Sequence, residues 1–162
     1  MRDALRVRMK PDWDEIGRTS ERGLRFLASH RISPQLAEAL YMIISELLEN
    51  SLKYGVYATE KERVALSIRV ADRQVIVEVS NPFDESCRAH LETLDKLVQW
   101  IRGYQDPFEA YLEKLREVSR RPLQDETSGL GLARIAYEGG AILDFFVDEK
   151  KLLNVSALST LE

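Results

Sequence analysis

The most informative stretch of this sequence is SELLENSLKYG, residues 45–55. Glu46, Asn50 and Lys53 stand at i, i+4 and i+7, which places their side chains on one side of an α-helix. Glu46 is suited to orienting or deprotonating an attacking group, Asn50 to ligating Mg²⁺ through its amide oxygen, and Lys53 to neutralising phosphate. Taken alone, three such residues are more often the solvated face of an amphipathic helix.

This motif lies at the end of a predicted helix. Ser33 has the character of an N-cap and Pro34 that of a first helical residue, whereas Gly55 is suited to end the helix. The apolar stripe of this helix recurs at helical spacing and consists of Leu36, Leu40, Ile43 and Leu47. The sequence therefore predicts a helix with one buried face and a polar face that carries the motif.

Shorter elements surround this helix. Residues 5–9 alternate apolar and basic side chains and predict an edge strand, and Asp12 is suited to cap a helix that reaches about His30. Further strands are predicted at residues 64–70, 75–79, 142–147 and 152–158. This order of elements predicts an α+β fold, a two-layer sandwich with helices on one face of a mostly antiparallel sheet. The length of 162 residues suits a single domain, residues 1–162.

The stretch from 84 to 127 is polar, helical in period and nearly free of glycine. It predicts two amphipathic helices inserted into the domain, whose apolar faces consist of Leu91, Leu94, Val98 and Ile101 in the first and Phe108, Leu112, Leu115 and Val118 in the second. We expect these faces first to pack on each other as an αα-hairpin. A dimer or client interface anchored by Trp100 and Tyr104 is the alternative.

A second motif precedes another predicted helix. Ser128, Gly129, Leu130, Gly131 and Leu132 form a glycine turn in which backbone N–H groups can approach phosphate closely, and a helix start favours anions. Glycine turns before helices are common, so this signal is weak by itself. The turn is not a Walker loop, because no Gly-Lys-Ser/Thr follows, and it lacks the three glycines of a dinucleotide fingerprint.

Together the two motifs resemble the ATP-binding superfamily of histidine kinases, gyrase B and the bacterial anti-sigma serine kinases, which share the Bergerat fold. Glu46-x-x-x-Asn50-x-x-Lys53-Tyr54-Gly55 is similar to the Asn-bearing helix of that superfamily, and residues 128–132 are similar to its second glycine box. The resemblance covers the core of the chain and implies ATP and Mg²⁺ as cofactors. It implies that Glu46 positions the acceptor hydroxyl or water, that Asn50 ligates Mg²⁺, and that Lys53 and the glycine box face phosphate.

One position departs from this resemblance. The superfamily usually has Asp-x-Gly-x-Gly after the central strand, and its Asp receives the adenine amino group. Here Asn81-Pro82, which we expect to end the strand, stands at that place, and neither glycine is present. The oxygen of Asn81 can still accept one hydrogen bond from an amine, but it brings no charge. The departure bears on nucleotide affinity and not on the fold. In the same resemblance, residues 84–127 take the place of the nucleotide lid.

The composition excludes several classes of function. With 23 Lys and Arg against 27 Asp and Glu, the net charge is −4, which is poorly suited to binding nucleic acid through its phosphates. The one cysteine, Cys87, rules out an internal disulfide framework and suits an incidental thiol in a reducing compartment. No signal peptide and no apolar run of ~20 residues is present, so we expect no membrane contact and a cytoplasmic protein.

Two hypotheses compete for the function. The first is a Mg-ATP-dependent Ser/Thr protein kinase of the anti-sigma, partner-switching type, whose client is a small protein resembling a sigma factor or its antagonist. The second is a scaffold that kept the fold and binds its partner without nucleotide. The absence of further domains argues against an ATPase engine. The apolar faces of the inserted helices are also suited to a homodimer.

Overall fold

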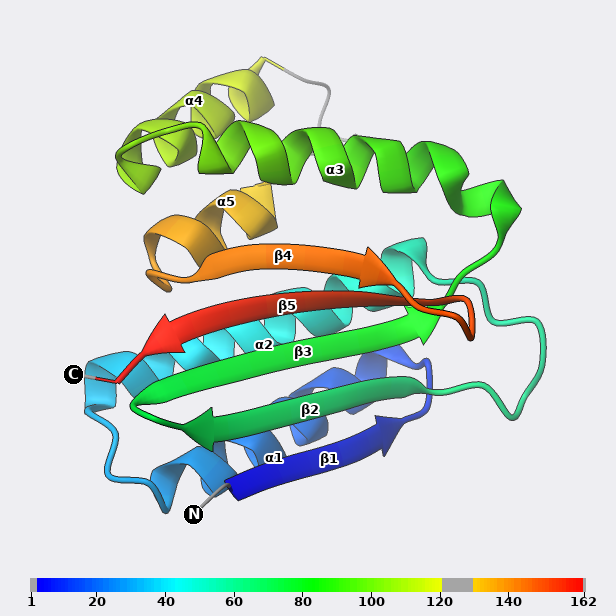
Figure 1. Ribbon diagram of the computed structural model, residues 1–162, viewed down its shortest axis with the longest axis horizontal. Coiled ribbons are helices and arrows are strands. Elements are labelled where there is room, and N and C mark those ends of the chain that lie inside the picture. Colours follow the sequence, from blue (N-terminus) through cyan, green and yellow to red (C-terminus); the bar gives the residue numbers. More distant parts are fainter. Residues whose placement is uncertain (1–2, 121–129, 162) are drawn as a thin grey trace.

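The computed structural model describes residues 3–120 and 130–161. Five antiparallel strands form one sheet in the order β1-β2-β3-β5-β4 (Figure 1). The strands are β1 (Asp3–Met9), β2 (Val64–Ala71), β3 (Gln74–Pro82), β4 (Ile142–Val147) and β5 (Leu152–Thr160). The predicted α+β sandwich with an antiparallel sheet is confirmed.

Two long helices cover one face of the sheet. They are α1 (Ile16–Ala28), which follows the short 3₁₀ helix Trp13–Glu15, and α2 (Pro34–Tyr54). In Figure 1 they lie behind the strands, and among the described residues no helix covers the face toward the viewer. The remaining helices, α3 (Arg88–Arg102), α4 (Pro107–Ser119) and α5 (Leu130–Tyr137), gather beyond the β4 edge (Figure 1). Within the described part of the chain, no helix has the length and apolar character needed to cross a membrane.

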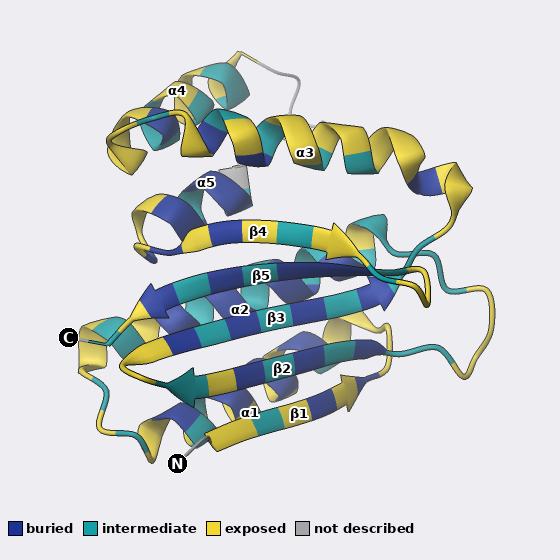
Figure 2. Cartoon of the chain, in the orientation of Figure 1, coloured by how far each residue is buried: buried dark blue, intermediate teal, exposed yellow. Residues whose placement is uncertain are grey.

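The strands alternate between the two faces of the sheet, as their sequences predict (Figure 2). In β3, Val75, Val77 and Val79 are buried against the helices, whereas Glu78 between them is only half-buried. The strand was expected to end before Asn81-Pro82 but continues through both residues, which pair with β5. Pro82 is tolerated there because the β2–β3 pairing stops at Ser80, so no second ladder requires its missing N–H.

Side-chain caps and one close contact set the positions of α1 and α2. The Ser33 hydroxyl accepts the N–H of Leu36 at 3.2 Å, as expected of the N-cap of α2. Gly23 allows α1 to approach the core, because a Cβ at this position would lie 2.8 Å from Ile44 Cδ1 and 2.9 Å from Ile68 Cδ1. The polar face of α2 is thereby fixed relative to the sheet.

The inserted helices form where expected, but each also packs on the rest of the domain. Asp106 caps α4 by accepting the N–H of Phe108 at 3.0 Å. Val98 and Ile101 of α3 are buried in the main hydrophobic core. Helix α4 packs on α5, where the ring of Tyr111 stacks on Tyr137 with centroids 5.3 Å apart. The αα-hairpin therefore covers the domain rather than closing only on itself.

Candidate functional site

A cavity of about 800 Å³ lies between α2 and α3 and is called the α2–α3 cavity below. Its floor is the inner face of β3 and β5, represented by Val79, Asn81, Leu153 and Val155, and the first turn of α5 reaches one end. Apolar side chains from α3 complete the lining, namely Leu91, Leu94, Leu97 and Trp100. A cavity of this size and mixed lining suits a small organic ligand.

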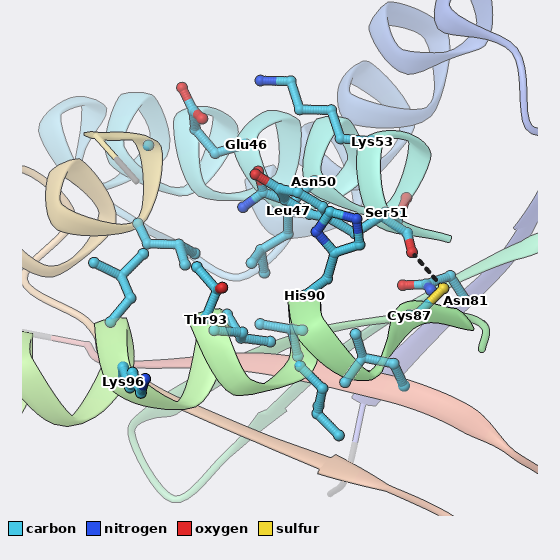
Figure 3. A pocket seen from close by; sticks show the side chains of 18 of the residues that line it. Glu46, Leu47, Asn50, Ser51, Lys53, Asn81, Cys87, His90, Thr93 and Lys96 are labelled. Atoms are coloured by element: carbon cyan, nitrogen blue, oxygen red, sulfur yellow. Dashed lines mark hydrogen bonds between the residues drawn. The ribbon is translucent and has the colours of Figure 1, made fainter. Parts of the chain in front are cut away.

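The α2 wall carries the three polar residues of the first motif. Glu46, Asn50 and Lys53 all line the α2–α3 cavity. In Figure 3, Asn50 extends from α2 toward His90 and Thr93 of α3, whereas the ends of Glu46 and Lys53 point away from α3 in this view. Glu46 and Asn50 are half-buried and Lys53 is exposed. The helical spacing therefore places these side chains around one cavity, whereas their roles stay predictions.

Burial and neighbouring charges act in opposite directions on Glu46. Burial raises the pKa of Glu46 above 4.5, and the carboxylate of Glu49 raises it further. Arg134 and Lys53 lower the pKa, and Nη1 of Arg134 lies 3.7 Å from Oε1 of Glu46. Arg134 is shared, because its Nε also donates to Glu138 at 2.7 Å. The net upward shift makes Glu46 a stronger proton acceptor than an ordinary surface carboxylate.

The described half of the glycine box lies directly against Glu46. A Cβ on Gly131 would overlap Oε2 of Glu46, so only glycine permits this approach. Leu132 is buried and lines the α2–α3 cavity, and Leu130 begins α5. Ser128 and Gly129, which were also predicted to bind phosphate, lie outside the described residues. The two motifs therefore meet at one end of the cavity through Gly131 and Glu46.

Asn81 lies at the floor of the cavity and is buried. Its Nδ2 donates to the backbone oxygen of Pro82 at 3.0 Å. Within the described part of the chain, no hydrogen bond to its amide oxygen is formed, so this oxygen is the available acceptor. Cys87 is buried near Asn81 (Figure 3), and its thiol donates to the backbone oxygen of Tyr54 at 3.6 Å. A neutral amide here provides one hydrogen-bond acceptor and no charge.

Helices α3 and α4 contribute cavity residues that the sequence alone did not identify. His90, Thr93 and Lys96 of α3 line the cavity, and the ring of His90 lies 5.2 Å from that of Tyr54. Lys114 of α4 also lines it, and its Nζ pairs with Glu117 at 3.0 Å. His90, Thr93 and Lys96 are each three residues apart, and this spacing was a usable signal because such residues share one helix face.

The resemblance implies Mg²⁺, so the side chains around the cavity should offer oxygen ligands to this cation. Within the described residues, no group of three or more His, Cys, Asp or Glu side chains is arranged to hold a metal. Mg²⁺ does not require such a group, because it keeps several waters and is held by one or two protein oxygens together with substrate phosphates. The amide oxygen of Asn50, with Glu46 beside it, fits this mode of binding and does not fit a dedicated all-protein metal cage.

Comparison with known proteins shows a likeness to solved structures. No protein-family model matches the chain, and no curated protein matches it. Among solved structures, the crystal structure of the SiaB–SiaC complex from Pseudomonas aeruginosa contains a chain of similar fold, with a TM-score of 0.68 and 17% sequence identity. The likeness covers 96% of this chain and 88% of that chain. At this identity the comparison shows a shared fold.

Proposed function

We propose that this chain is an ATP-binding regulatory protein that acts as a Mg-ATP-dependent Ser/Thr protein kinase on a small protein partner. The observation that carries the proposal is the convergence of Glu46, Asn50, Asn81 and Gly131 on one cavity, although these residues come from three separate parts of the sequence. Glu46, Asn50 and Lys53 of the first motif and Gly131 of the second line this cavity, together with polar residues of α3 and α4 that neither motif contains. The convergence of motif residues that are far apart in the sequence supports a nucleotide as the ligand of this cavity.

The size and the polarity of the cavity support a nucleotide as its ligand. A volume of about 800 Å³ lies within the range of small-molecule sites. The buried acceptor of Asn81 suits the exocyclic amine of adenine, and the apolar side chains of Leu47, Val79 and Leu153 suit the faces of a base. The amino groups of Lys53 and Lys96 suit the triphosphate. Hydrogen bonding at the floor and positive charge nearer the opening match the two ends of ATP.

Each residue would then have a distinct task. Mg²⁺, held by Asn50 and by phosphate oxygens, supplies charge neutralisation when bound. In transfer, the hydroxyl oxygen of the partner's Ser or Thr bonds to the γ-phosphorus, the bond to the β-bridging oxygen breaks, and ADP leaves. Glu46 accepts the hydroxyl proton, a task favoured by its raised pKa. Arg134 holds the Glu46 carboxylate against the glycine turn.

The neighbour of similar fold supports a role in protein binding. That chain occurs in a complex that is named for two proteins, SiaB and SiaC. We infer that this chain likewise acts on a protein and not on a small metabolite, as expected of a partner-switching regulator.

Isothermal titration calorimetry with Mg-ATP tests nucleotide binding. We expect the wild-type chain to bind Mg-ATP, Asn50→Ala to lose this binding, and Gln35→Ala to retain it. Gln35 is a matched control because it is an exposed amide on the same helix, far from the cavity lining. Absence of heat at millimolar nucleotide, or equal affinities of the Asn50 and Gln35 variants, would remove the kinase proposal.

Transfer is tested on the partner that copurifies with the chain from its own cells. With γ-labelled ATP, label should appear on Ser or Thr of the partner and should be absent with Glu46→Ala, while both proteins give the same circular dichroism spectrum. Label that is transferred equally by Glu46→Ala would show that this carboxylate is not the proton acceptor.

A nucleotide-independent scaffold is the second candidate, and the β3 end favours it. The usual carboxylate is replaced by Asn81, whose Nδ2 is already bound to the carbonyl of Pro82, and the glycines that allow a close backbone approach are absent. This candidate predicts that partner binding is the same with and without ATP and the same for Asn50→Ala. Partner affinity that depends on nucleotide would end it.

A further inference from the structure

A second hollow lies at one end of the strands, where the end of β1, the loop before β2 and the β4–β5 turn lie, at the right of Figure 1. It has a volume of about 600 Å³ and is called the basic hollow below. Its charged lining consists of five cations, Arg8, Lys61, Arg63, Lys150 and Lys151, and one carboxylate, Glu62. Phe83 lines both the basic hollow and the α2–α3 cavity, so the two are neighbours.

The cations of the basic hollow are little compensated by the described residues, although the charge of Lys150 acts on Asp148 in the same turn and lowers its pKa. Among the described residues, none of the five makes an ion pair. Oε2 of Glu62 accepts the backbone N–H of Ala58 at 2.7 Å, so its charge is partly compensated by a local hydrogen bond. Arg63 is held in place, because its Nη1 donates to the backbone oxygens of Glu60 at 2.6 Å and Glu62 at 2.9 Å.

The backbone of the β4–β5 turn, which carries Lys150 and Lys151, is held by hydrogen bonds. Oδ1 of Asp148 accepts the N–H of Lys150 at 2.9 Å and that of Leu152 at 3.1 Å, and these backbone hydrogen bonds lower the pKa of Asp148. Asp148 and the exposed Glu149 belong to the same turn but do not line the basic hollow. The hollow therefore collects positive charge although carboxylates are close by in the sequence.

We propose that the basic hollow docks a short acidic segment of the partner protein, an inference that rests on the proposed function as a regulator of a protein client. Five cations and one carboxylate give the hollow a charge of +4. Since the whole chain has a net charge of −4, the remainder carries −4 − (+4) = −8. A hollow of net positive charge on a chain whose remainder is net negative attracts a partner with the opposite pattern.

This charge distribution also selects the class of ligand. A nucleic acid extends its phosphates beyond a hollow of this size and would meet the acidic remainder of the surface. The cations come from three separate segments, β1, the loop before β2 and the β4–β5 turn, and a hollow of about 600 Å³ has room for more than one carboxylate. Several carboxylates of an extended peptide match this arrangement better than one compact anion does.

Fluorescence anisotropy with a labelled oligoglutamate peptide tests the docking surface on the full chain. We expect the wild type to bind the peptide at low salt and to lose affinity as salt is added, and we expect an oligoglutamine peptide not to bind. The variant Lys61→Glu/Lys150→Glu should bind oligoglutamate about tenfold more weakly, because two favourable charge pairs become repulsive. The variant Arg18→Glu/Arg22→Glu, which carries the same charge change on exposed positions of α1, should bind like the wild type.

Other outcomes would overturn the proposal. These are the absence of oligoglutamate binding to the wild type at low salt, an equal loss in the α1 control variant, and stronger competition by inorganic phosphate or a single-stranded oligonucleotide than by unlabelled oligoglutamate. If the charge reversal impairs folding, the docking surface is tested instead by the oligoglutamate affinity of Lys61→Gln/Lys150→Gln, which should be lower than that of the wild type, and by the salt dependence of wild-type binding. Mg-ATP titration separates the two proposals, because the Lys61/Lys150 variants should bind Mg-ATP normally and Asn50→Ala should bind oligoglutamate normally.

Discussion

Replacing Gly131 by alanine tests whether the glycine box and Glu46 are in contact. The new Cβ would overlap Oε2 of Glu46, so the carboxylate has to move. Because this group is the far end of a flexible side chain, we expect a strain of about 0.5–1.5 kcal/mol. Alanine is also better than glycine in a helix by about 1 kcal/mol. The free energy of unfolding should therefore stay within about 1 kcal/mol of the wild-type value.

The position of the carboxylate should change much more than the stability. Burial is the main cause of the raised pKa of Glu46, so a carboxylate displaced toward solvent should titrate closer to the ordinary value of 4.5. Carboxyl-detected NMR titration measures this pKa, and urea denaturation measures the stability. If transfer occurs, displacement of the base by about 1 Å should slow it on the order of 10²-fold.

Two other glycines calibrate this experiment. Gly17 is the second residue of α1, as Gly131 is of α5, and a Cβ there meets no atom within 4 Å, so Gly17→Ala should stabilise the protein by up to about 1 kcal/mol. Gly23→Ala places a Cβ against core methyl groups and should incur an overpacking cost of about 1–3 kcal/mol. The reasoning is refuted if Gly131→Ala leaves the pKa of Glu46 unchanged, or if it destabilises the protein more than Gly23→Ala does.

Three further predictions concern pH and the core. Since the folded-state pKa of Glu46 is raised above 4.5, the wild type should lose stability relative to Glu46→Gln as pH rises through that pKa, and parallel pH profiles of the two in urea denaturation would contradict this. Burial raises the pKa of Tyr57 to about 12 from 10.0, so the wild type should lose stability relative to Tyr57→Phe as pH rises from 10 to 12; a constant difference would show that Tyr57 titrates normally. Ile101 is 5% exposed in the core, so Ile101→Ala should cost about 2–5 kcal/mol in urea denaturation, whereas a loss below about 1 kcal/mol would mean that α3 does not unfold with the sheet.

Local signals in the sequence were enough to predict most of the fold. Alternation in β2 and β3 and the cap at Ser33 depend on neighbouring residues, so the sequence shows them directly. The end of β3 was predicted too early, because the tolerance of Pro82 depends on where β2 stops pairing. The surface that buries Val98 also could not be predicted, since a helical period gives an apolar face and not the surface that covers it.

The residues of the candidate site also fall into those that the local sequence predicts and those that depend on tertiary packing. Glu46 and Asn50 were predicted because both lie on one helix at a spacing that the sequence shows. The contact of Arg134 with Glu46, and the presence of Lys114 beside the cavity, depend on how α4 and α5 pack on the rest of the domain. These contacts are tertiary, so no local sequence pattern predicts them.

The central claim is that the α2–α3 cavity binds Mg-ATP, and amide chemical shifts measured during a titration test it directly. We expect the largest changes in residues 46–54, 79–83 and 88–97, with no change in the exposed positions of β1 on the open sheet face. We also expect Asn50→Ala to abolish these changes. The account is contradicted if millimolar Mg-ATP leaves the spectrum unaltered, or if the shifts appear only around the basic hollow.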